Sequence, residues 1–247
     1  MGSGMEKVAL VTGGGTGIGQ AISVRLARDN FRVAIIYSKS EKEAFETADR
    51  IEKLGGRCEP IRANLAEQDQ VERALRDVIK KFGALGWLIN NAGATRQLPF
   101  EELDRIEDTM WDELFATNVK SVFNLSRAAA PYLSQSKDGS ILNTGSIAGE
   151  TGYGSSLPYA VSKAATHGLT RSLARALAPK VRVNAIAPGA VATRWWAGNE
   201  EKMRHLAGRV ALGRISTPEE IADSAFMILS SKSMTGQIIR LDNGQTL

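Results

Sequence analysis

Short runs of β-branched and apolar residues alternate with longer amphipathic stretches along almost the whole chain. The runs predicted to form strands are Val8–Thr12, Val33–Tyr37, Trp87–Asn90, Ile141–Thr144, Val181–Ala187 and Ile238–Leu241, with a weaker one at Arg57–Arg62. Several of them are apolar without alternation, as in strands that are covered on both faces of a parallel sheet. This feature constrains the fold most, because neighbouring parallel strands need crossover connections.

The stretches between these runs carry apolar residues at helical spacing. They are Gly19–Asn30, Glu41–Leu54, Gln68–Phe82, Trp111–Ser134, Tyr159–Leu177 and Pro218–Leu229. Thr217, Pro218 and Glu220 predict a capping box at the start of the last helix. The pattern therefore predicts a doubly wound α/β fold, in which helices lie on both faces of a mainly parallel seven-stranded sheet.

No internal repeat or linker-like segment divides the 247 residues, so we expect a single domain over residues 5–247. Residues 1–4, Met-Gly-Ser-Gly, are interpreted as an added linker before Met5. Residues 190–215 have the least regular pattern. We expect them to form a lid with a short helix over the substrate.

Composition restricts the possible partners. Lys and Arg number 31 against 27 for Asp and Glu, and this net charge of +4 is too small and dispersed to indicate nucleic-acid binding. No apolar run approaches the ~20 residues of a membrane span. Cys58 is the only cysteine, and His167 and His205 are too few and too separated to suggest a metal site. We expect a cytoplasmic protein that uses neither metal, membrane nor nucleic acid.

A glycine-rich turn follows the first predicted strand. Residues 12–19 read TGGGTGIG, so that Gly13, Gly17 and Gly19 are spaced as G-x-x-x-G-x-G just before a helix. Such a turn lets the backbone approach a pyrophosphate, which the free N–H groups of the helix then bind. A glycine cluster alone is also compatible with a tight strand-to-helix turn. We interpret it as a dinucleotide-binding loop.

The end of the second strand bears on the choice of nucleotide. Tyr37 stands where an NAD site usually places an acid that bonds the ribose 2′-hydroxyl. Ser38, Lys39 and Ser40 follow, and they offer two hydroxyls and one ammonium to a 2′-phosphate. These residues favour NADP(H) over NAD(H), although Thr16 supplies no second cation in the glycine loop.

Three residues form a candidate proton-transfer group. Ser146 precedes Tyr159 by thirteen residues, and Lys163 follows Tyr159 by one helical turn on the same face. A tyrosine titrates near pH ~10, and a neighbouring cation is expected to lower its pKa. Tyr159 can then give a proton to a carbonyl oxygen, or take one from an alcohol, as a nicotinamide carries the hydride.

With these motifs in hand, the chain resembles the short-chain dehydrogenase/reductase family and its Rossmann fold. The motifs are TGGGTGIG, Asn90-Asn91-Ala92-Gly93, Asn118, Ser146, Tyr159 with Lys163, and Pro188-Gly189, in the family's order and spacing. The resemblance implies that Ser146 orients the substrate carbonyl and that Tyr159 transfers the proton. It also implies that Lys163 holds the nicotinamide ribose and that Asn118 anchors a water for proton transfer.

The resemblance extends to the cofactor site. Residues implied to contact the cofactor, besides Tyr159 and Lys163, are Gly13, Gly15, Thr16, Gly17, Ile18, Gly19, Tyr37, Ser38, Lys39, Ser40, Asn64, Leu65, Asn91, Ala92, Gly93, Pro188, Gly189, Val191 and Thr193. Asn64 replaces the aspartate that the family usually has after its third strand. For Asn90, Pro188 and Thr193 a purely structural role also stays open, namely a strand-end turn, a rigid loop and a helix cap.

The sequence is most similar to the 3-oxoacyl-acyl-carrier-protein reductase type, on account of residues 90–93, 145–152 and 241–245. Ala148, Tyr153, Trp195 and Trp196 join Ser146 and Tyr159 as expected substrate contacts. Arg127, Arg171 and Arg175 offer a docking face to an acidic carrier protein, or are simply solvated. Family members usually form homotetramers through the two long helices and the last strand, and we expect the same here.

Two other functions stay open. One is an NAD(H)-dependent dehydrogenase of the same fold that acts on a sugar, a polyol or another secondary alcohol. The other is a non-catalytic nucleotide-binding regulator, which we expect to have lost one of Ser146, Tyr159 and Lys163. Since all three are present, the sequence favours an enzyme.

Overall fold

The computed structural model describes residues 7–194, 198 and 200–247 of the chain. The predicted linker at residues 1–4 lies outside the described residues. So do Trp195 and Trp196, two of the expected substrate contacts.

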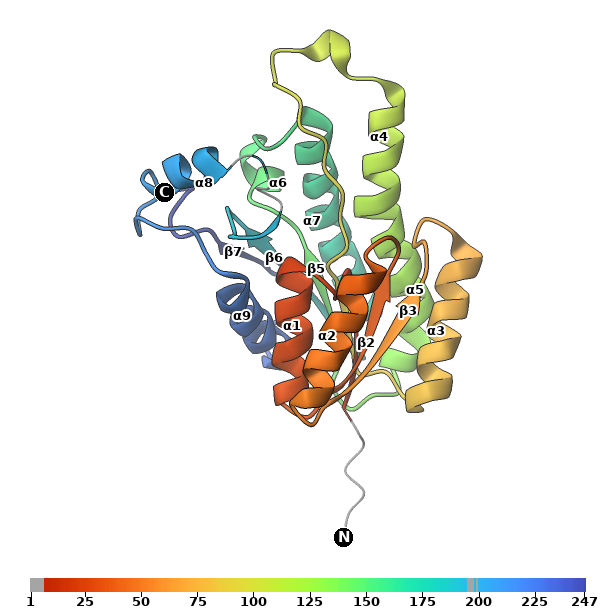
Figure 1. The fold of residues 1–247 in the computed structure, drawn as a ribbon. Coiled ribbons are helices and arrows are strands. Elements are labelled where there is room, and N and C mark those ends of the chain that lie inside the picture. Colours follow the sequence, from red (N-terminus) through yellow and green to blue (C-terminus); the bar gives the residue numbers. More distant parts are fainter. Residues whose placement is uncertain (1–6, 195–197, 199) are drawn as a thin grey trace.

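Seven strands form one sheet, and each observed pairing is parallel (Figure 1). Their order across the sheet is β3-β2-β1-β4-β5-β6-β7. The strands are β1 (Val8–Thr12), β2 (Arg32–Tyr37), β3 (Arg57–Arg62), β4 (Trp87–Asn90), β5 (Gly139–Thr144), β6 (Val181–Pro188) and β7 (Ile238–Leu241). All seven predicted runs are confirmed as strands, including the weaker one, which is the edge strand β3.

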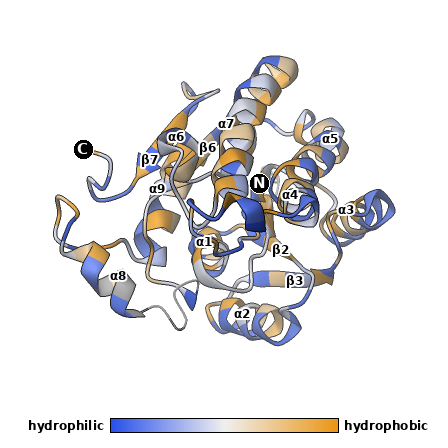
Figure 2. Ribbon diagram, turned by 90° about the horizontal axis from the view of Figure 1, so that it is seen from above, coloured by the Kyte–Doolittle hydropathy of each residue, from blue (hydrophilic) through white to orange (hydrophobic). Residues whose placement is uncertain are grey.

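Helices cover both faces of the sheet, as predicted. On one face lie α1 (Gly17–Arg28), α2 (Glu41–Lys53) and α9 (Pro218–Ser230), and on the other lie α3 (Gln68–Phe82), α5 (Ser121–Leu133) and α7 (Leu157–Leu177). Figure 2, from above, shows many hydrophilic residues on α2 and α3 at the rim of the molecule.

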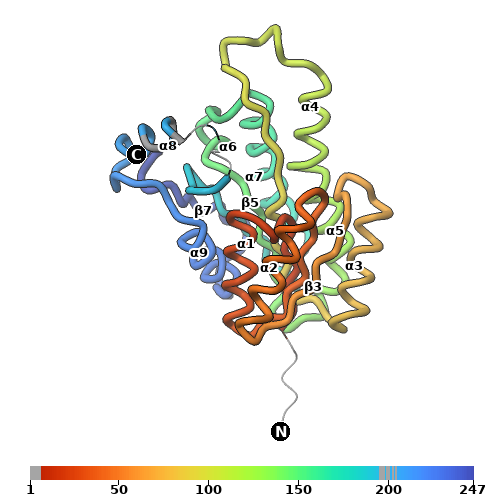
Figure 3. Tube along the Cα trace, in the orientation of Figure 1, coloured from red at the N-terminus to blue at the C-terminus, as the bar shows by residue number. Residues whose placement is uncertain are grey.

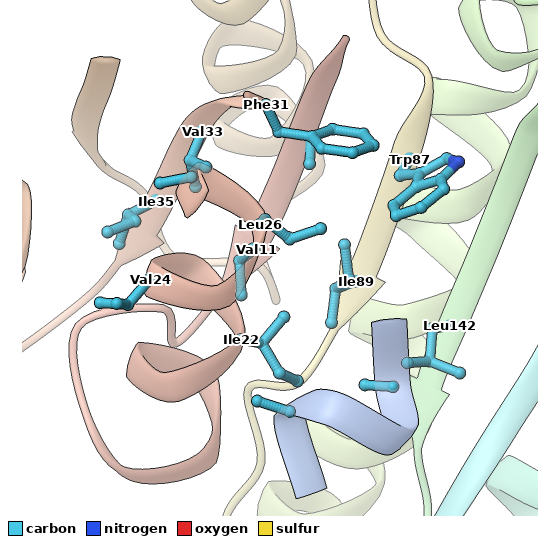
Figure 4. Packing of buried hydrophobic residues seen from close by; sticks show 14 of the residues in the cluster. Val11, Ile22, Val24, Leu26, Phe31, Val33, Ile35, Trp87, Ile89 and Leu142 are labelled. Atoms are coloured by element: carbon cyan, nitrogen blue, oxygen red, sulfur yellow. The ribbon is translucent and has the colours of Figure 1, made fainter. Parts of the chain in front are cut away.

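The alternation of side chains along each strand explains the two cores. In β1, Ala9 and Val11 belong to the cluster under α1, whereas Val8 and Leu10 belong to the cluster under α3 and α5. Figure 4 shows Val11 beside Ile22 of α1 in the first cluster. Because both faces are buried, the strand favours apolar residues on both sides, and four of its five residues are apolar.

Several helical details differ from the predictions, among them α1, which spans Gly17–Arg28 where Gly19–Asn30 was predicted. The single helix expected over Trp111–Ser134 is divided into α4 (Asp108–Phe115), a π-helical turn η2 (Ala116–Lys120) and α5. Helix α7 begins two residues earlier than predicted, because the Ser156 hydroxyl caps it by accepting from the Tyr159 N–H at 3.4 Å. Two short helices, η1 (Leu103–Arg105) and α6 (Ala148–Thr151), were not predicted.

The predicted capping box is present at α9. The Glu220 N–H donates to the Thr217 hydroxyl at 3.3 Å, and the Glu220 carboxylate accepts from the Thr217 N–H at 2.8 Å. The short helix expected between residues 190 and 215 is α8 (Glu200–Ala207).

The structure shows no helix in the described ranges that is long and apolar enough to cross a bilayer. Nor do those ranges hold a cluster of three His, Cys, Asp or Glu side chains suited to a metal. Cys58 is buried in β3, and burial raises the pKa of its thiol to about 12, so it is a neutral packing residue.

Candidate active site

The loops that follow β1, β4, β5 and β6 meet at the carboxyl edge of the sheet (Figure 3). The order of strands reverses between β1 and β4, which is where doubly wound sheets bind ligands. Thr12 joins the first two loops, because its hydroxyl accepts from the N–H groups of Asn91 and Ala92, both at 2.9 Å. The side-chain amide of Asn91 in turn donates to the Thr12 carbonyl at 3.1 Å.

The glycine-rich loop has no room for larger residues at its closest approaches. A Cβ on Gly19 would lie 2.3 Å from the Gly13 carbonyl oxygen, and Gly17 has a φ of 52°, which favours glycine. Thr16 is the N-cap of α1 but makes no side-chain capping bond. The first N–H groups of α1 therefore face the loop without a side-chain acceptor, as a pyrophosphate site requires.

Ser146, Tyr159 and Lys163 lie together, as predicted. Ser146 follows β5, and its side chain hydrogen-bonds to the Tyr159 phenol, which is only 9% exposed. The Ser146 oxygen also accepts from the Ala148 N–H at 3.1 Å. The Lys163 ammonium is 5.8 Å from the centre of the Tyr159 ring and donates to the Thr144 carbonyl at 2.8 Å.

The pKa of Tyr159 differs from the prediction. Burial raises it to about 12, against the lowering effect of the Ser146 hydrogen bond, so the predicted lowering by Lys163 is not found. The reason is that the Lys163 ammonium is directed to the Thr144 carbonyl and is itself desolvated, which lowers its pKa to about 8. At neutral pH, Tyr159 is a phenol and Lys163 is mostly charged.

Asn118 is buried in the π-helical turn η2 and makes three side-chain hydrogen bonds. Its amide accepts from the Ala94 N–H at 2.8 Å and donates to the Ala94 carbonyl at 3.0 Å and the Ser162 hydroxyl at 2.9 Å. Gly93 lies in the same corner, because a Cβ there would be 3.3 Å from the Asn118 amide oxygen and 3.5 Å from the Lys163 ammonium. Asn118 thus ties the loop after β4 to α7.

Near the carboxyl end of β2, Ser38 and Lys39 are exposed. Tyr37 is buried, and its hydroxyl donates to the Glu41 carboxylate at 2.9 Å. Burial and the nearby Glu41 raise the Tyr37 pKa. Asn64 is exposed and its side-chain oxygen accepts from the Ala66 N–H at 3.1 Å, so its amide nitrogen points elsewhere. Leu65 beside it is half-buried.

The loop after β6 is held by backbone hydrogen bonds to the segments after β5 and in β7. The Pro188 carbonyl accepts from the Ile147 N–H at 3.1 Å, and the Gly189 N–H donates to the Leu241 carbonyl at 3.0 Å. Val191 is buried. Thr193 faces the glycine loop, since a Cβ on Gly17 would be 3.4 Å from the Thr193 methyl group.

Two of the residues expected to contact the substrate, Ala148 and Tyr153, lie near Tyr159 and Phe100 respectively. Ala148 is buried against Tyr159, together with Phe100 and Met110 from the segment before α4 and its first turn. Tyr153 is 72% exposed and stacks on Phe100, with ring centres 4.9 Å apart. Tyr153 therefore covers the solvent side of Phe100, and it is not the only residue of the wall beside Tyr159. Ile18 is half-buried and packs against the hydrophobic cluster under α1.

Comparison with known proteins agrees with this geometry. Residues 7–204 match the family model described as short chain dehydrogenase. The chain belongs to the short-chain dehydrogenase/reductase family. It is 35% identical over 244 residues to the 3-oxoacyl-acyl-carrier-protein reductase FabG of Staphylococcus aureus (strain N315), covering 97% of this chain and 98% of that protein. It is 57% identical over 129 residues to the short-chain dehydrogenase/reductase homolog YusR of Bacillus subtilis (strain 168), covering 52% of this chain and all of that protein.

Solved structures of the family have the same fold. A short-chain dehydrogenase/reductase from Burkholderia xenovorans matches with a TM-score of 0.92 and 32% identity, over 99% of both chains. A mutant of a Serratia marcescens short-chain dehydrogenase/reductase matches with a TM-score of 0.90 and 34% identity, over 98% of both chains. The chain is therefore an oxidoreductase of the carbonyl and alcohol type with a nicotinamide cofactor, similar to the 3-oxoacyl reductases.

Several residues of this family member's site were not singled out from the sequence. Thr12 was quoted only as part of the glycine motif, and its strand-end position gave no sign of the bonds to Asn91 and Ala92. Phe100 and Met110 lie in a segment without periodicity, so only the folded chain brings them to Tyr159. His167 is one helical turn after Lys163, a spacing that could have marked it as a neighbour.

Proposed function

We propose that this short-chain dehydrogenase/reductase transfers a hydride between NADP(H) and a ketone or secondary alcohol, with Tyr159 as the general acid or base. The observation that carries the proposal is the buried Tyr159 phenol, bonded to Ser146 and one helical turn from the Lys163 ammonium. This arrangement serves proton transfer.

The residues at the carboxyl edge of the sheet fit a dinucleotide. The crowded Gly19 and the uncapped start of α1 suit a pyrophosphate, and Gly93 leaves space beside Asn118 and Lys163 for a ribose. When bound, the nicotinamide supplies or accepts the hydride at the carbonyl carbon. Pro188, Gly189 and Thr193 would form the wall at that end, and Asn91 fixes the loop opposite them.

The residues of the chain handle the proton. In the reducing direction, Ser146 donates a hydrogen bond to the substrate carbonyl, and neutral Tyr159 gives its proton to the same oxygen. The raised pKa of Tyr159 keeps that proton in place until the oxygen becomes basic. Lys163 would hold the nicotinamide ribose, as the resemblance to the family implies, and Asn118 would anchor a water that leads the replacement proton toward Tyr159. Oxidation runs through the same groups in reverse.

Preference for NADP(H) is supported by the exposed Ser38 and Lys39 and the half-buried Ser40 after β2. The alternative, an NAD(H)-dependent sugar or polyol dehydrogenase, is favoured by one observation. Glu41 lies near the same strand end, held by the Tyr37 hydroxyl at 2.9 Å, and a carboxylate there suits a free ribose 2′-hydroxyl. Initial rates with NADPH and NADH, for the wild type and Lys39→Ala, separate the two. Equal efficiency with both cofactors contradicts the NADP(H) proposal.

For the substrate, we propose a 3-oxoacyl thioester or a similar apolar ketone. Phe100, Met110 and Ala148 form an apolar wall beside Tyr159, which suits an acyl chain better than a sugar. The S. aureus relative is named as a reductase of carrier-bound 3-oxoacyl groups. Three arginines, Arg127, Arg171 and Arg175, are exposed on α5 and α7 and would suit an acidic carrier protein.

We further propose that residues 5–247 act as one domain in a cytoplasmic homotetramer, with residues 190–215 as the lid. Phe123 of α5 and Val161 of α7 are 39% and 41% exposed, and they give these two helices apolar surface for a partner copy. Light scattering at micromolar concentration tests the assembly. A monomer contradicts it.

The experiment that tests the function is a screen of NADPH oxidation over 3-oxoacyl thioesters, cyclic and aryl ketones, and sugars. We expect the fastest turnover with a 3-oxoacyl thioester, and slower turnover with compact ketones. Faster turnover of sugars, with NADH in place of NADPH, would support the alternative instead.

A further inference from the structure

Arg194, in the segment that follows β6, contacts the start of α2 with its side chain. One guanidinium nitrogen pairs with the Glu43 carboxylate at 3.0 Å, and another donates to the Ser40 hydroxyl at 2.9 Å. These partners are 151 and 154 residues away in the sequence. The contact therefore joins the first part of the expected lid to the start of α2, where we expect the adenosine half of the cofactor to bind.

The same three segments touch at other points. A Cβ on Gly15 would lie 2.7 Å from the Ala44 Cα, so the glycine loop rests directly on the first turn of α2. Gly17 lies under Thr193, next to Arg194. The glycine loop, the start of α2 and residues 193–194 thus meet at the carboxyl edge of the sheet (Figure 3). The phosphates of a dinucleotide bound at the glycine loop would lie close to these segments.

The Arg194–Glu43 pair is easily opened. The Arg194 side chain is 58% exposed and that of Glu43 is 40% exposed, and an ion pair in such a position stabilises a fold only slightly. A phosphate offers a guanidinium two acceptor oxygens and more charge than a carboxylate does. A 2′-phosphate held by Ser38, Lys39 and Ser40 would arrive beside the very hydroxyl to which Arg194 already donates.

We propose that Arg194 is the second cation of the 2′-phosphate site, and that it exchanges its Glu43 partner for this phosphate when NADP(H) binds. The proposal rests on the NADP(H) preference proposed above. Arg194 would then supply the second positive charge that the glycine loop lacks, because that loop has the neutral Thr16. The exchange also makes the start of the lid part of cofactor selection, because Arg194 is fixed in place by the phosphate that distinguishes NADP(H) from NAD(H).

The test is equilibrium binding to the purified full chain, with NADPH, NADH, 2′,5′-ADP and 5′-AMP as ligands. We expect Arg194→Ala to weaken the binding of NADPH and 2′,5′-ADP by about tenfold, as for a lost charge-assisted hydrogen bond, and to leave NADH and 5′-AMP within about twofold. Glu43→Gln removes the competing carboxylate, so it is expected to tighten the two phosphate-bearing ligands. Arg209→Ala, at an exposed arginine further along the same segment, is the matched control and should change neither.

The outcomes separate this proposal from the proposed function. If the wild type binds NADPH and 2′,5′-ADP more tightly than NADH and 5′-AMP, while Arg194→Ala leaves these ratios unchanged, the role of Arg194 is refuted and the NADP(H) preference stands. If Arg194→Ala weakens all four ligands equally, Arg194 serves the common part of the cofactor and the exchange is again refuted. A wild type that does not distinguish 2′,5′-ADP from 5′-AMP overturns both.

Discussion

Acidification should destabilise the protein through one buried histidine. His167 is 3% exposed in α7, and its Nε2 has no hydrogen-bond partner within the described chain. Burial, followed by the charges of Lys163 and Arg171, lowers the His167 pKa to about 4 from an ordinary 6.5. A Cβ on Gly145 would lie 2.3 Å from that Nε2, so the imidazole is packed against the backbone just before Ser146.

The sign and size of the effect follow from this shift. Between pH 6.5 and 4 the unfolded chain binds a proton at His167 and the folded chain does not, so stability falls as the pH falls. At about 1.4 kcal/mol per pKa unit, the loss between pH 7 and pH 4.5 is about 2.5 kcal/mol. Replacing His167 by Leu keeps a side chain of similar size and removes this titration.

Urea unfolding at pH 7 and pH 4.5 measures the effect. Carboxylates also titrate in this range, so the informative quantity is the pH-dependent change in the free energy of unfolding for the wild type minus that for His167→Leu. His205→Leu is the control, because His205 is exposed. The same pH dependence in the wild type and His167→Leu would refute the inference that His167 stays neutral in the fold.

Three further results are expected. The rate of ketone reduction should fall as the pH rises through about 8, because Lys163 then loses its charge; a pH–rate profile that stays flat to pH 10 contradicts this. Gly15→Ala should weaken cofactor binding at least tenfold in fluorescence titrations, because its Cβ would displace the Ala44 backbone; unchanged affinity contradicts this. Asn118→Ala should lower the free energy of unfolding by about 1–3 kcal/mol, because the N–H and carbonyl of Ala94 lose their partners; unchanged urea midpoints contradict this.

The strands could be predicted because burial on both faces leaves a strong local signal. β1 is apolar at every position except its last, and its boundaries match the prediction. The apolar pattern did not reveal that the predicted helix Trp111–Ser134 is divided. The π-helical turn that carries Asn118 leaves the apolar spacing on either side nearly helical, and its hydrogen bonds go to Ala94 and Ser162, which are distant in sequence.

The proton-transfer group was predictable because Tyr159 and Lys163 share one helix face, and Ser146 belongs to a recognisable motif. Their electrostatics were not predictable. Spacing gives the proximity of the ammonium to the phenol, whereas the pKa of Tyr159 depends chiefly on its burial, which sequence spacing does not report. Contacts such as Arg194 with Glu43 likewise depend on the closed fold, since they join segments that the chain separates by most of its length.

The central claim is that Tyr159 supplies the proton, and Tyr159→Phe tests it most directly. The measurement is single-turnover reduction of a 3-oxoacyl thioester by bound NADPH, with NADPH affinity determined on the same preparation. The account predicts a loss of at least about 100-fold in rate, as for removal of a general acid, with NADPH affinity unchanged within about twofold. Reduction at a rate close to that of the wild type would contradict it.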